Sequence, residues 1–127
     1  MSHWAEQYIG IPWQAGGRGP DAYDCWGLLL HVMRRHYGRS IQDCNVSEIE
    51  AGELRRLAGE WRPVDAPRDG DGVKMGSAER LHVGVYVNQN GGAVLHCAER
   101  YGVILTQVSA LRSMGFSPVT YYRWQGL

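Results

Sequence analysis

The periodicity of apolar residues changes once along this chain, near Pro67, and that change limits the folds it can adopt. Before Pro67 the apolar residues recur at helical spacing, and after it they alternate or form short runs typical of strands. The predicted strands are 72–75, 81–87, 93–98, 103–108 and 119–124, with a hairpin turn at 88–92 and one helical turn within 109–115. Helices followed by strands favour an α+β fold with an antiparallel sheet.

Three helices are expected in the first half of the chain. A short one ends at Gly10, and a longer one runs from Cys25 to Gly38 with apolar residues spaced to form a single face. A third follows the capping box at 47–50 and extends to Trp61. With 127 residues and no linker or internal repeat, the chain is expected to form one domain over 1–127.

A cysteine stands at the start of the longer helix, directly after Asp24, which is a good N-cap residue. Free N–H groups and the positive end of the helix dipole favour a thiolate at this position. The sequence therefore predicts an acidic thiol at Cys25, and makes this residue a candidate nucleophile. The remaining cysteines are interpreted as a loop thiol, Cys44, and a buried apolar residue, Cys97.

Two histidines fall on predicted strands joined by the hairpin. Alternation places His82 on the face opposite the valines of its strand, and His96 on the face opposite Leu95 and Cys97. A register that pairs Val87 with Gly91 sets the histidines directly across from each other, whereas a shift by one residue separates them. If the face of His82 packs against the start of the Cys25 helix, a nucleophile, a base and an orienting residue line up.

Such an arrangement can transfer an acyl group from an amide. Cys25 attacks the carbonyl, His82 moves the proton, His96 holds the ring of His82, and backbone N–H groups at the helix start receive the oxyanion. No metal or organic cofactor is required. Because the three side chains are also zinc-ligand types, a metal site is the alternative, although no closely spaced ligand pair anchors it. Residues 69–72 lack most ligands of a calcium loop and are read as a turn.

The order of these motifs resembles the NlpC-type cysteine peptidases, which are papain-like cell-wall hydrolases, and is most similar to their bacteriophage tail-associated branch. The similarity spans most of the chain, and it is carried by segments 8–13, 24–28, 70–73, 82–87, 95–96 and 121–123. It implies a papain-like fold with Cys25 as nucleophile, His82 as base and His96 as third polar residue. The implied substrate is a peptidoglycan stem peptide, often cut between D-γ-glutamyl and a diamino acid.

The resemblance also suggests residues that contact substrate. Housekeeping members commonly have serine after the cysteine and tyrosine in the upstream loop, and Trp26 and Trp13 stand in or near these places here. Tail-associated relatives are similar in having tryptophan after the cysteine. Trp13, Trp26 and, beyond its capping role, Asp24 are therefore the expected substrate-binding residues. A bulky Trp26 also leaves open a non-catalytic tail-assembly or wall-binding module, while a related lipid acyltransferase is disfavoured because its histidine precedes the cysteine.

Charge and composition limit the classes of partner that the chain is expected to bind. Thirteen basic and thirteen acidic residues give a formal net charge of zero, which does not favour nucleic-acid binding. No run approaches membrane-spanning length, and the first residues lack the pattern of a signal peptide. We expect synthesis in the cytoplasm, no membrane insertion, and a virion- or tail-associated protein that acts at the cell wall, with phage tail proteins as further partners. His3, His31 and His36 are expected at terminal, solvated or edge positions.

Overall fold

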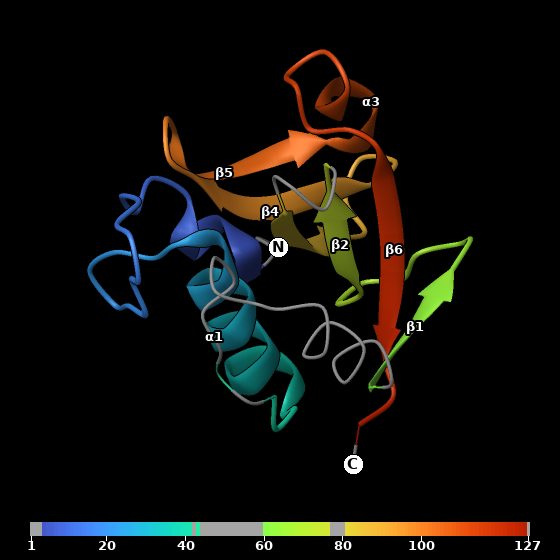
Figure 1. Ribbon diagram of the computed structural model, residues 1–127, viewed down its shortest axis with the longest axis horizontal. Helices are drawn as coiled ribbons and strands as arrows, with labels where there is room; N and C mark the ends of the chain where they lie inside the picture. Colours follow the sequence, from blue (N-terminus) through green and yellow to red (C-terminus); the bar gives the residue numbers. More distant parts are fainter. Residues whose placement is uncertain (1–3, 42, 44–59, 77–80, 127) are drawn as a thin grey trace.

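The computed structural model describes residues 4–41, 43, 60–76 and 81–126 (Figure 1). The elements in chain order are η1 (Trp4–Tyr8), α1 (Cys25–Tyr37), β1 (Trp61–Val64), β2 (Gly72–Met75), β3 (His82–Val87), β4 (Ala93–Ala98), β5 (Gly102–Gln107), α3 (Val108–Leu111) and β6 (Val119–Trp124). This confirms the α+β class and the five predicted strands to within one residue at either end. None of the described helices is both long enough and apolar enough to cross a membrane.

Helix α1 begins and ends where its sequence signals place it. Asp24 is the N-cap, and its carboxylate accepts a hydrogen bond of 2.6 Å from the backbone N–H of Gly27. Gly38 ends the helix in the left-handed conformation, with φ 61°, and its N–H bonds to the carbonyl of Met33. The local sequence thus fixes both the direction of the helix and the position of Cys25 at its first residue.

All strand pairs in the six-stranded sheet are antiparallel, in the order β1-β6-β2-β3-β4-β5. At one edge, β1 contains Pro63, which has no N–H to offer. At the other edge, the N-terminal segment lies along β5: Gly10 N–H donates to the Val103 carbonyl at 3.0 Å, and Val103 N–H donates to the Ile11 carbonyl at 2.8 Å.

The two faces of the sheet carry different clusters of buried side chains. Helix α1 packs on one face, where its apolar residues meet Val85, Val87, Leu95 and Cys97. On the opposite face, Tyr86 and Val94 pack with Leu111 of α3 and with Phe116 from the loop that follows. Figure 1 shows α1 and α3 on separate sides of the sheet. Alternation along β3 and β4 therefore decides which side chains lie under the helix and which lie away from it.

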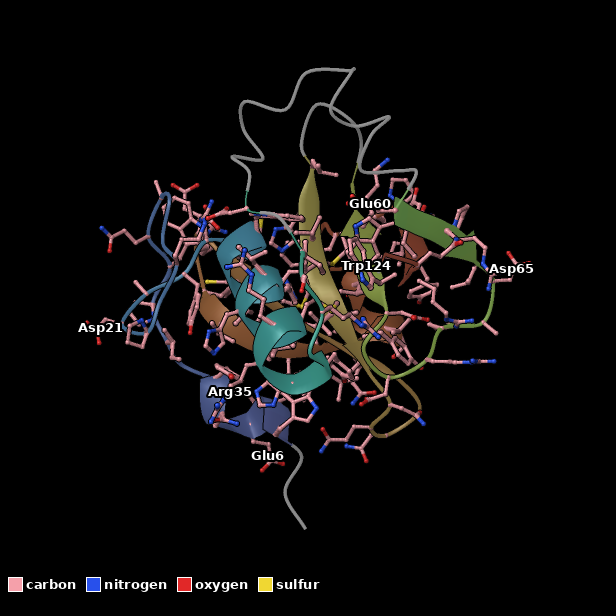
Figure 2. All side chains as sticks on the ribbon, turned by 90° about the horizontal axis from the view of Figure 1, so that it is seen from below. Glu6, Asp21, Arg35, Glu60, Asp65 and Trp124 are labelled. Carbon is pink, nitrogen blue, oxygen red and sulfur yellow. The ribbon has the colours of Figure 1, made fainter. Side chains whose placement is uncertain are left out.

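The predicted helix that extends to Trp61 is wrong at its end, because Trp61 begins β1 and pairs with Trp124 of β6. The two indole rings lie 5.1 Å apart in an edge-to-face arrangement, and Figure 2 shows Trp124 close to Glu60. Helical spacing of Trp61 with upstream leucines is what produced the wrong prediction. The capping box at 47–50 and Cys44 lie outside the described residues.

His31 and His36, for which a solvated or edge position was expected, are partly exposed, and both contact Tyr8. The hydroxyl of Tyr8 in η1 lies 3.0 Å from Nε2 of His31 and 2.7 Å from Nε2 of His36, both on α1. The ring of Trp4 stacks on His36 with centroids 4.5 Å apart. These contacts attach η1 to the helix that bears Cys25, whereas Arg35 on the same helix lies at the surface (Figure 2).

Candidate active site

Cys25 lies at the first position of α1 and is partly exposed. The residue before it is held firmly, because Oδ1 of Asp24 accepts hydrogen bonds from Gly27 and from Nη1 of Arg18, the latter at 2.9 Å. Arg18 in turn lies 3.0 Å from the carboxylate of Asp43. The loop that precedes α1 is thus tied to the helix start, which fixes the backbone on which Cys25 sits.

The expectation of an acidic thiol at Cys25 is wrong for the protein at rest. Burial raises the pKa of the thiol above its ordinary value, and the Asp24 carboxylate raises it further. The backbone N–H groups of Val83, Trp26 and Cys25 itself act in the opposite direction without reversing the shift. The helix start supplies the expected donors, but their effect is outweighed by the loss of water around the sulfur.

The two strand histidines contact each other. Nε2 of His82 lies 2.8 Å from Nδ1 of His96, and the ring planes meet at 74°. The register differs from the one considered from sequence, because Val87 pairs with Ala93 and the residue opposite His96 is Gly84. A shift of two residues preserves the face, so the histidines still share it and meet on the diagonal.

The face that bears the histidines is not the face on which α1 packs. The condition considered from sequence concerns only the start of the helix, at Cys25, and stays a prediction. The thiol approaches β3 at the backbone N–H of Val83, which is adjacent in the chain to His82. Within the described residues, neither imidazole forms a hydrogen bond to Cys25, and Nδ1 of His82 is engaged in none. Cys25 thus lies next to the backbone of β3 at the residue that follows His82.

Thr106 is a member of this cluster that sequence reasoning missed. Its hydroxyl oxygen lies 2.9 Å from Nε2 of His96, and it is 6% exposed. A signal for it exists in the sequence, because Thr106 is the polar residue on the β5 face shared with Ile104, and Ile104 pairs with His96. That signal becomes usable only once the register between β4 and β5 is known.

Phe116 shields the imidazoles. Its ring stacks on His82 with centroids 5.1 Å apart and meets His96 edge-on at 4.8 Å. Burial lowers the pKa of His82 to about 4. Burial and the neighbouring His82 lower the pKa of His96 to about 3. Both rings are therefore neutral at pH 7, and a neutral ring can act as a proton acceptor.

The expected substrate-binding residues lie in different environments. Trp26 is 5% exposed and belongs to the core under α1, which argues against its ring lining or blocking a cleft. Its indole N–H has no hydrogen-bond partner among the described residues. Trp13 is half-buried, packs against the same core, and forms an isolated bridge with Tyr23. Asp24 is engaged as a cap and ion-pair partner.

Cys97 is fully buried, as expected, and its sulfur donates to the carbonyl of Tyr23 at 3.2 Å. Burial is the main cause that raises its pKa to about 12. Across the described part of the chain, no three side chains of His, Cys, Asp or Glu gather in a way that could hold a metal ion.

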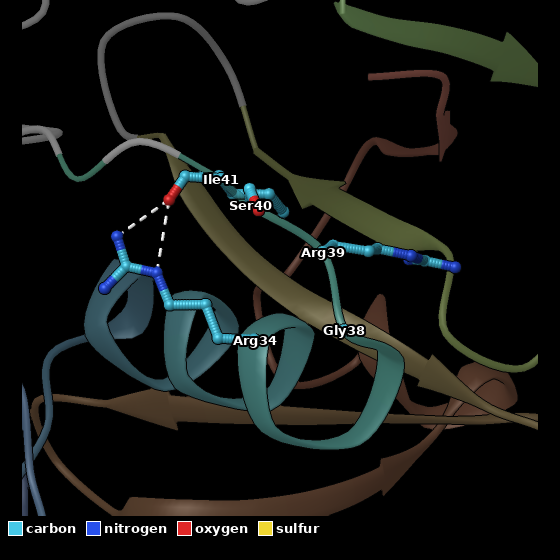
Figure 3. A pocket seen from close by; sticks show the side chains of 5 residues that line it. All are labelled: Arg34, Gly38, Arg39, Ser40 and Ile41. Carbon is cyan, nitrogen blue, oxygen red and sulfur yellow. Dashed lines mark hydrogen bonds between the residues drawn. The ribbon is translucent and has the colours of Figure 1, made fainter. Parts of the chain in front are cut away.

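A hollow of about 390 Å³ lies beside the C-terminal end of α1 (Figure 3). It is lined by Arg34, Gly38, Arg39, Ser40 and Ile41. Arg34 donates from Nε and Nη2 to the carbonyl of Ile41 at 3.2 and 2.8 Å, so this guanidinium is already used within the chain. The hollow contains none of the candidate catalytic side chains.

The fold and the motif order together define a papain-like domain with a cysteine at a helix start and two histidines on the sheet. Residues 10–124 match the sequence profile of the NlpC/P60 family, and the chain belongs to that family. The structure is similar to the crystal structure of the NlpC/p60 domain of the peptidoglycan hydrolase SagA. The TM-score is 0.63 at 24% identity, and the match covers 92% of this chain and 91% of that one.

A curated relative is "Protein P54" of Enterococcus faecium, which is 29% identical over 98 residues. The match covers 59% of this chain and 19% of that protein, so it corresponds to about a fifth of the relative's length. The likeness to SagA extends over nearly the whole chain and establishes the fold.

Proposed function

We propose that this protein is a cysteine peptidase that cleaves an amide bond in peptidoglycan stem peptides, with Cys25, His82 and His96 as its catalytic residues. Membership in the NlpC/P60 family supports the reaction class. The observation that carries the assignment of residues is the hydrogen-bonded pair of His82 and His96 at the start of β3, where the thiol of Cys25 meets the Val83 N–H.

The resting state consists of a thiol and a neutral imidazole. In the first step, Nδ1 of His82 accepts the thiol proton while the sulfur of Cys25 attacks the amide carbonyl carbon. The negative charge on the carbonyl oxygen is received by a backbone N–H at the start of α1. The resulting imidazolium remains hydrogen-bonded through Nε2 to Nδ1 of His96, which holds the ring in place.

Collapse of the tetrahedral intermediate breaks the C–N bond, and His82 delivers its proton to the departing amine. This leaves a thioester on Cys25. Neutral His82 then takes a proton from water as the water attacks the thioester, and the C–S bond breaks with return of that proton to sulfur. Phe116 covers the two rings and keeps bulk water away from them, which favours the neutral form of His82 before each step.

The bond we propose is the one between D-γ-glutamyl and a diamino acid, because the motif order resembles peptidases with that preference. We place the protein in a phage or prophage tail that acts at the cell wall, since tryptophan directly after the cysteine is similar to tail-associated relatives. The named relative SagA is a peptidoglycan hydrolase, which is consistent with a wall substrate.

Digestion of purified sacculi tests the proposal. Mass spectrometry of the products identifies both activity and the bond that is cut. We expect wild-type protein and Cys97→Ala to release stem-peptide fragments, and Cys25→Ala to release none. Cys97→Ala is the matched control because Cys97 is a second thiol, fully buried on the α1 face of the sheet. Release of fragments by Cys25→Ala at the wild-type rate would overturn the nucleophile assignment.

A second candidate is a binding or tail-assembly module of the same fold that has little or no turnover. The observation that favours it is the raised pKa of the Cys25 thiol, because a thiol that stays protonated is a weak nucleophile. The two candidates differ in whether His82 assists Cys25. In a binding module the reactivity of the thiol is independent of His82.

A further inference from the structure

The chain of hydrogen bonds does not end at His96. Three side chains from three adjacent strands form a line: His82 on β3, His96 on β4 and Thr106 on β5. The last two are 0% and 6% exposed, so their polar atoms depend on one another for hydrogen bonds. A line of this kind has a direction, because each imidazole nitrogen is either a donor or an acceptor.

Only one direction allows His82 to act as a base at Nδ1. That nitrogen must be free of hydrogen, so the proton of His82 is on Nε2 and is donated to Nδ1 of His96. His96 then carries its own proton on Nε2 and donates it to the hydroxyl oxygen of Thr106. In the reverse direction the hydroxyl donates, and the proton of His82 is on Nδ1, where the base needs a lone pair.

The contacts leave Nδ1 of His82 available to act as a base. Nδ1 of His82 has no hydrogen-bond partner within the described structure, and the site is shielded by Phe116. His82 is only partly buried, and its Nδ1 is not a buried atom. The productive direction leaves the lone pair there, and the reverse direction leaves the N–H.

We propose that Thr106 is a positioning residue that sets the tautomers of His96 and His82 by accepting a hydrogen bond from Nε2 of His96. This inference rests on the proposed function, in which His82 is the base. Thr106 touches neither substrate nor sulfur. Its oxygen stabilises the Nε2–H form of His96. The unprotonated Nδ1 of His96 then accepts a hydrogen bond from Nε2 of His82 and stabilises the Nε2–H form of that ring.

The first test needs no substrate. Long-range ¹H–¹⁵N correlation spectra of histidine-labelled protein at pH 7.5 report which ring nitrogen carries the proton, with single His→Gln variants to assign the signals. We expect His82 and His96 both to be Nε2–H forms in the wild type and in Thr106→Ser. In Thr106→Val, which preserves the shape but removes the acceptor, His96 should move toward the Nδ1–H form.

Kinetics on purified stem peptides complete the test. Thr106→Val should lower kcat about tenfold or more with KM nearly unchanged, because binding is intact and the base is mis-protonated. Thr106→Ser should restore most of the activity. An Nδ1–H form of His96 in the wild type would overturn the inference, as would unchanged tautomers in a folded Thr106→Val. A wild type that shows the expected tautomers but no hydrolysis would refute the proposed function and leave the role of Thr106 standing.

Discussion

His82 and His96 meet at 2.8 Å although they are not paired across the sheet, because Gly84 occupies the position opposite His96. A Cβ at Gly84 would lie 2.7 Å from Cγ1 of Val94, 2.8 Å from the Leu95 carbonyl oxygen and 2.9 Å from Cβ of His96. The missing side chain leaves room for the ring of His96 to lean toward His82.

Gly84→Ala should therefore disturb the histidine pair. We expect a loss of about 1–3 kcal/mol in the free energy of unfolding from overpacking, together with altered imidazole signals of His96. Gly10→Ala is the control, because a Cβ there meets nothing within 4 Å although its φ of 97° strains the backbone. Urea unfolding and histidine NMR check both variants. Wild-type histidine signals in Gly84→Ala would contradict the steric role of this glycine.

Stability should fall as the solution is acidified from pH 6.5 toward pH 4. The pKa of His82 is lowered to about 4 and that of His96 to about 3, against about 6.5 in the unfolded chain. In this window the unfolded state binds more protons, so each histidine removes up to about 1.4 kcal/mol per pH unit. Burial lowers the pKa of His31 too, which adds in the same direction.

Urea unfolding at pH 7.5, 6.5, 5.5 and 5.0 measures this slope. The double variant His82→Gln, His96→Gln cannot titrate at these positions, so its stability should change less over the same range. An equal slope in the wild type and the double variant would show that the two rings are not buried in neutral form.

Tyr8→Phe should weaken the attachment of η1 to α1. The variant keeps the ring but removes the hydroxyl that contacts His31 and His36. Loss of two partly buried hydrogen bonds predicts about 1–2 kcal/mol lower stability. Tyr101→Phe is the control, because Tyr101 is 48% exposed and its hydroxyl loss should cost less than about 0.5 kcal/mol. Equal stabilities of the two variants would argue against a stabilising role for the Tyr8 contacts.

Alkylation with iodoacetamide should distinguish the two candidate functions. In a peptidase, His82 assists loss of the thiol proton, so His82→Gln should slow labelling of Cys25 at pH 7 by about tenfold or more. Mass mapping follows each cysteine separately. Cys97 is the internal reference, since it is fully buried with a pKa raised to about 12 and should stay unlabelled in the native protein. Equal rates of Cys25 labelling in the wild type and in His82→Gln would favour the binding module.

The parts of the fold predicted from sequence are those with local causes. Asp24 and Gly38 fix the ends of α1 through their own hydrogen bonds, and alternation along β3 fixes the face of the strand on which His82 lies. The register of the hairpin is not local in this sense, because a shift of two residues leaves every face unchanged. Strand β1 was missed because Trp61 also fits a helical spacing, and its partner Trp124 lies far along the chain.

The sequence predicted that His82 and His96 can share one face of the sheet, but not the electrostatics of the candidate site. The helix start at Cys25 is visible in sequence, whereas the burial that raises its pKa depends on packing of the whole molecule. Thr106 was missed because its relation to His96 requires the pairing of β4 with β5. The side of the sheet that α1 covers also follows from tertiary packing.

The edge strands of the sheet affect how copies of the protein can associate at high concentration. Pro63 offers no donor at one border, and the backbone of Val103 is already occupied by residues 10 and 11 at the other. Addition of a strand from a neighbouring copy is therefore disfavoured at Pro63 and at Val103.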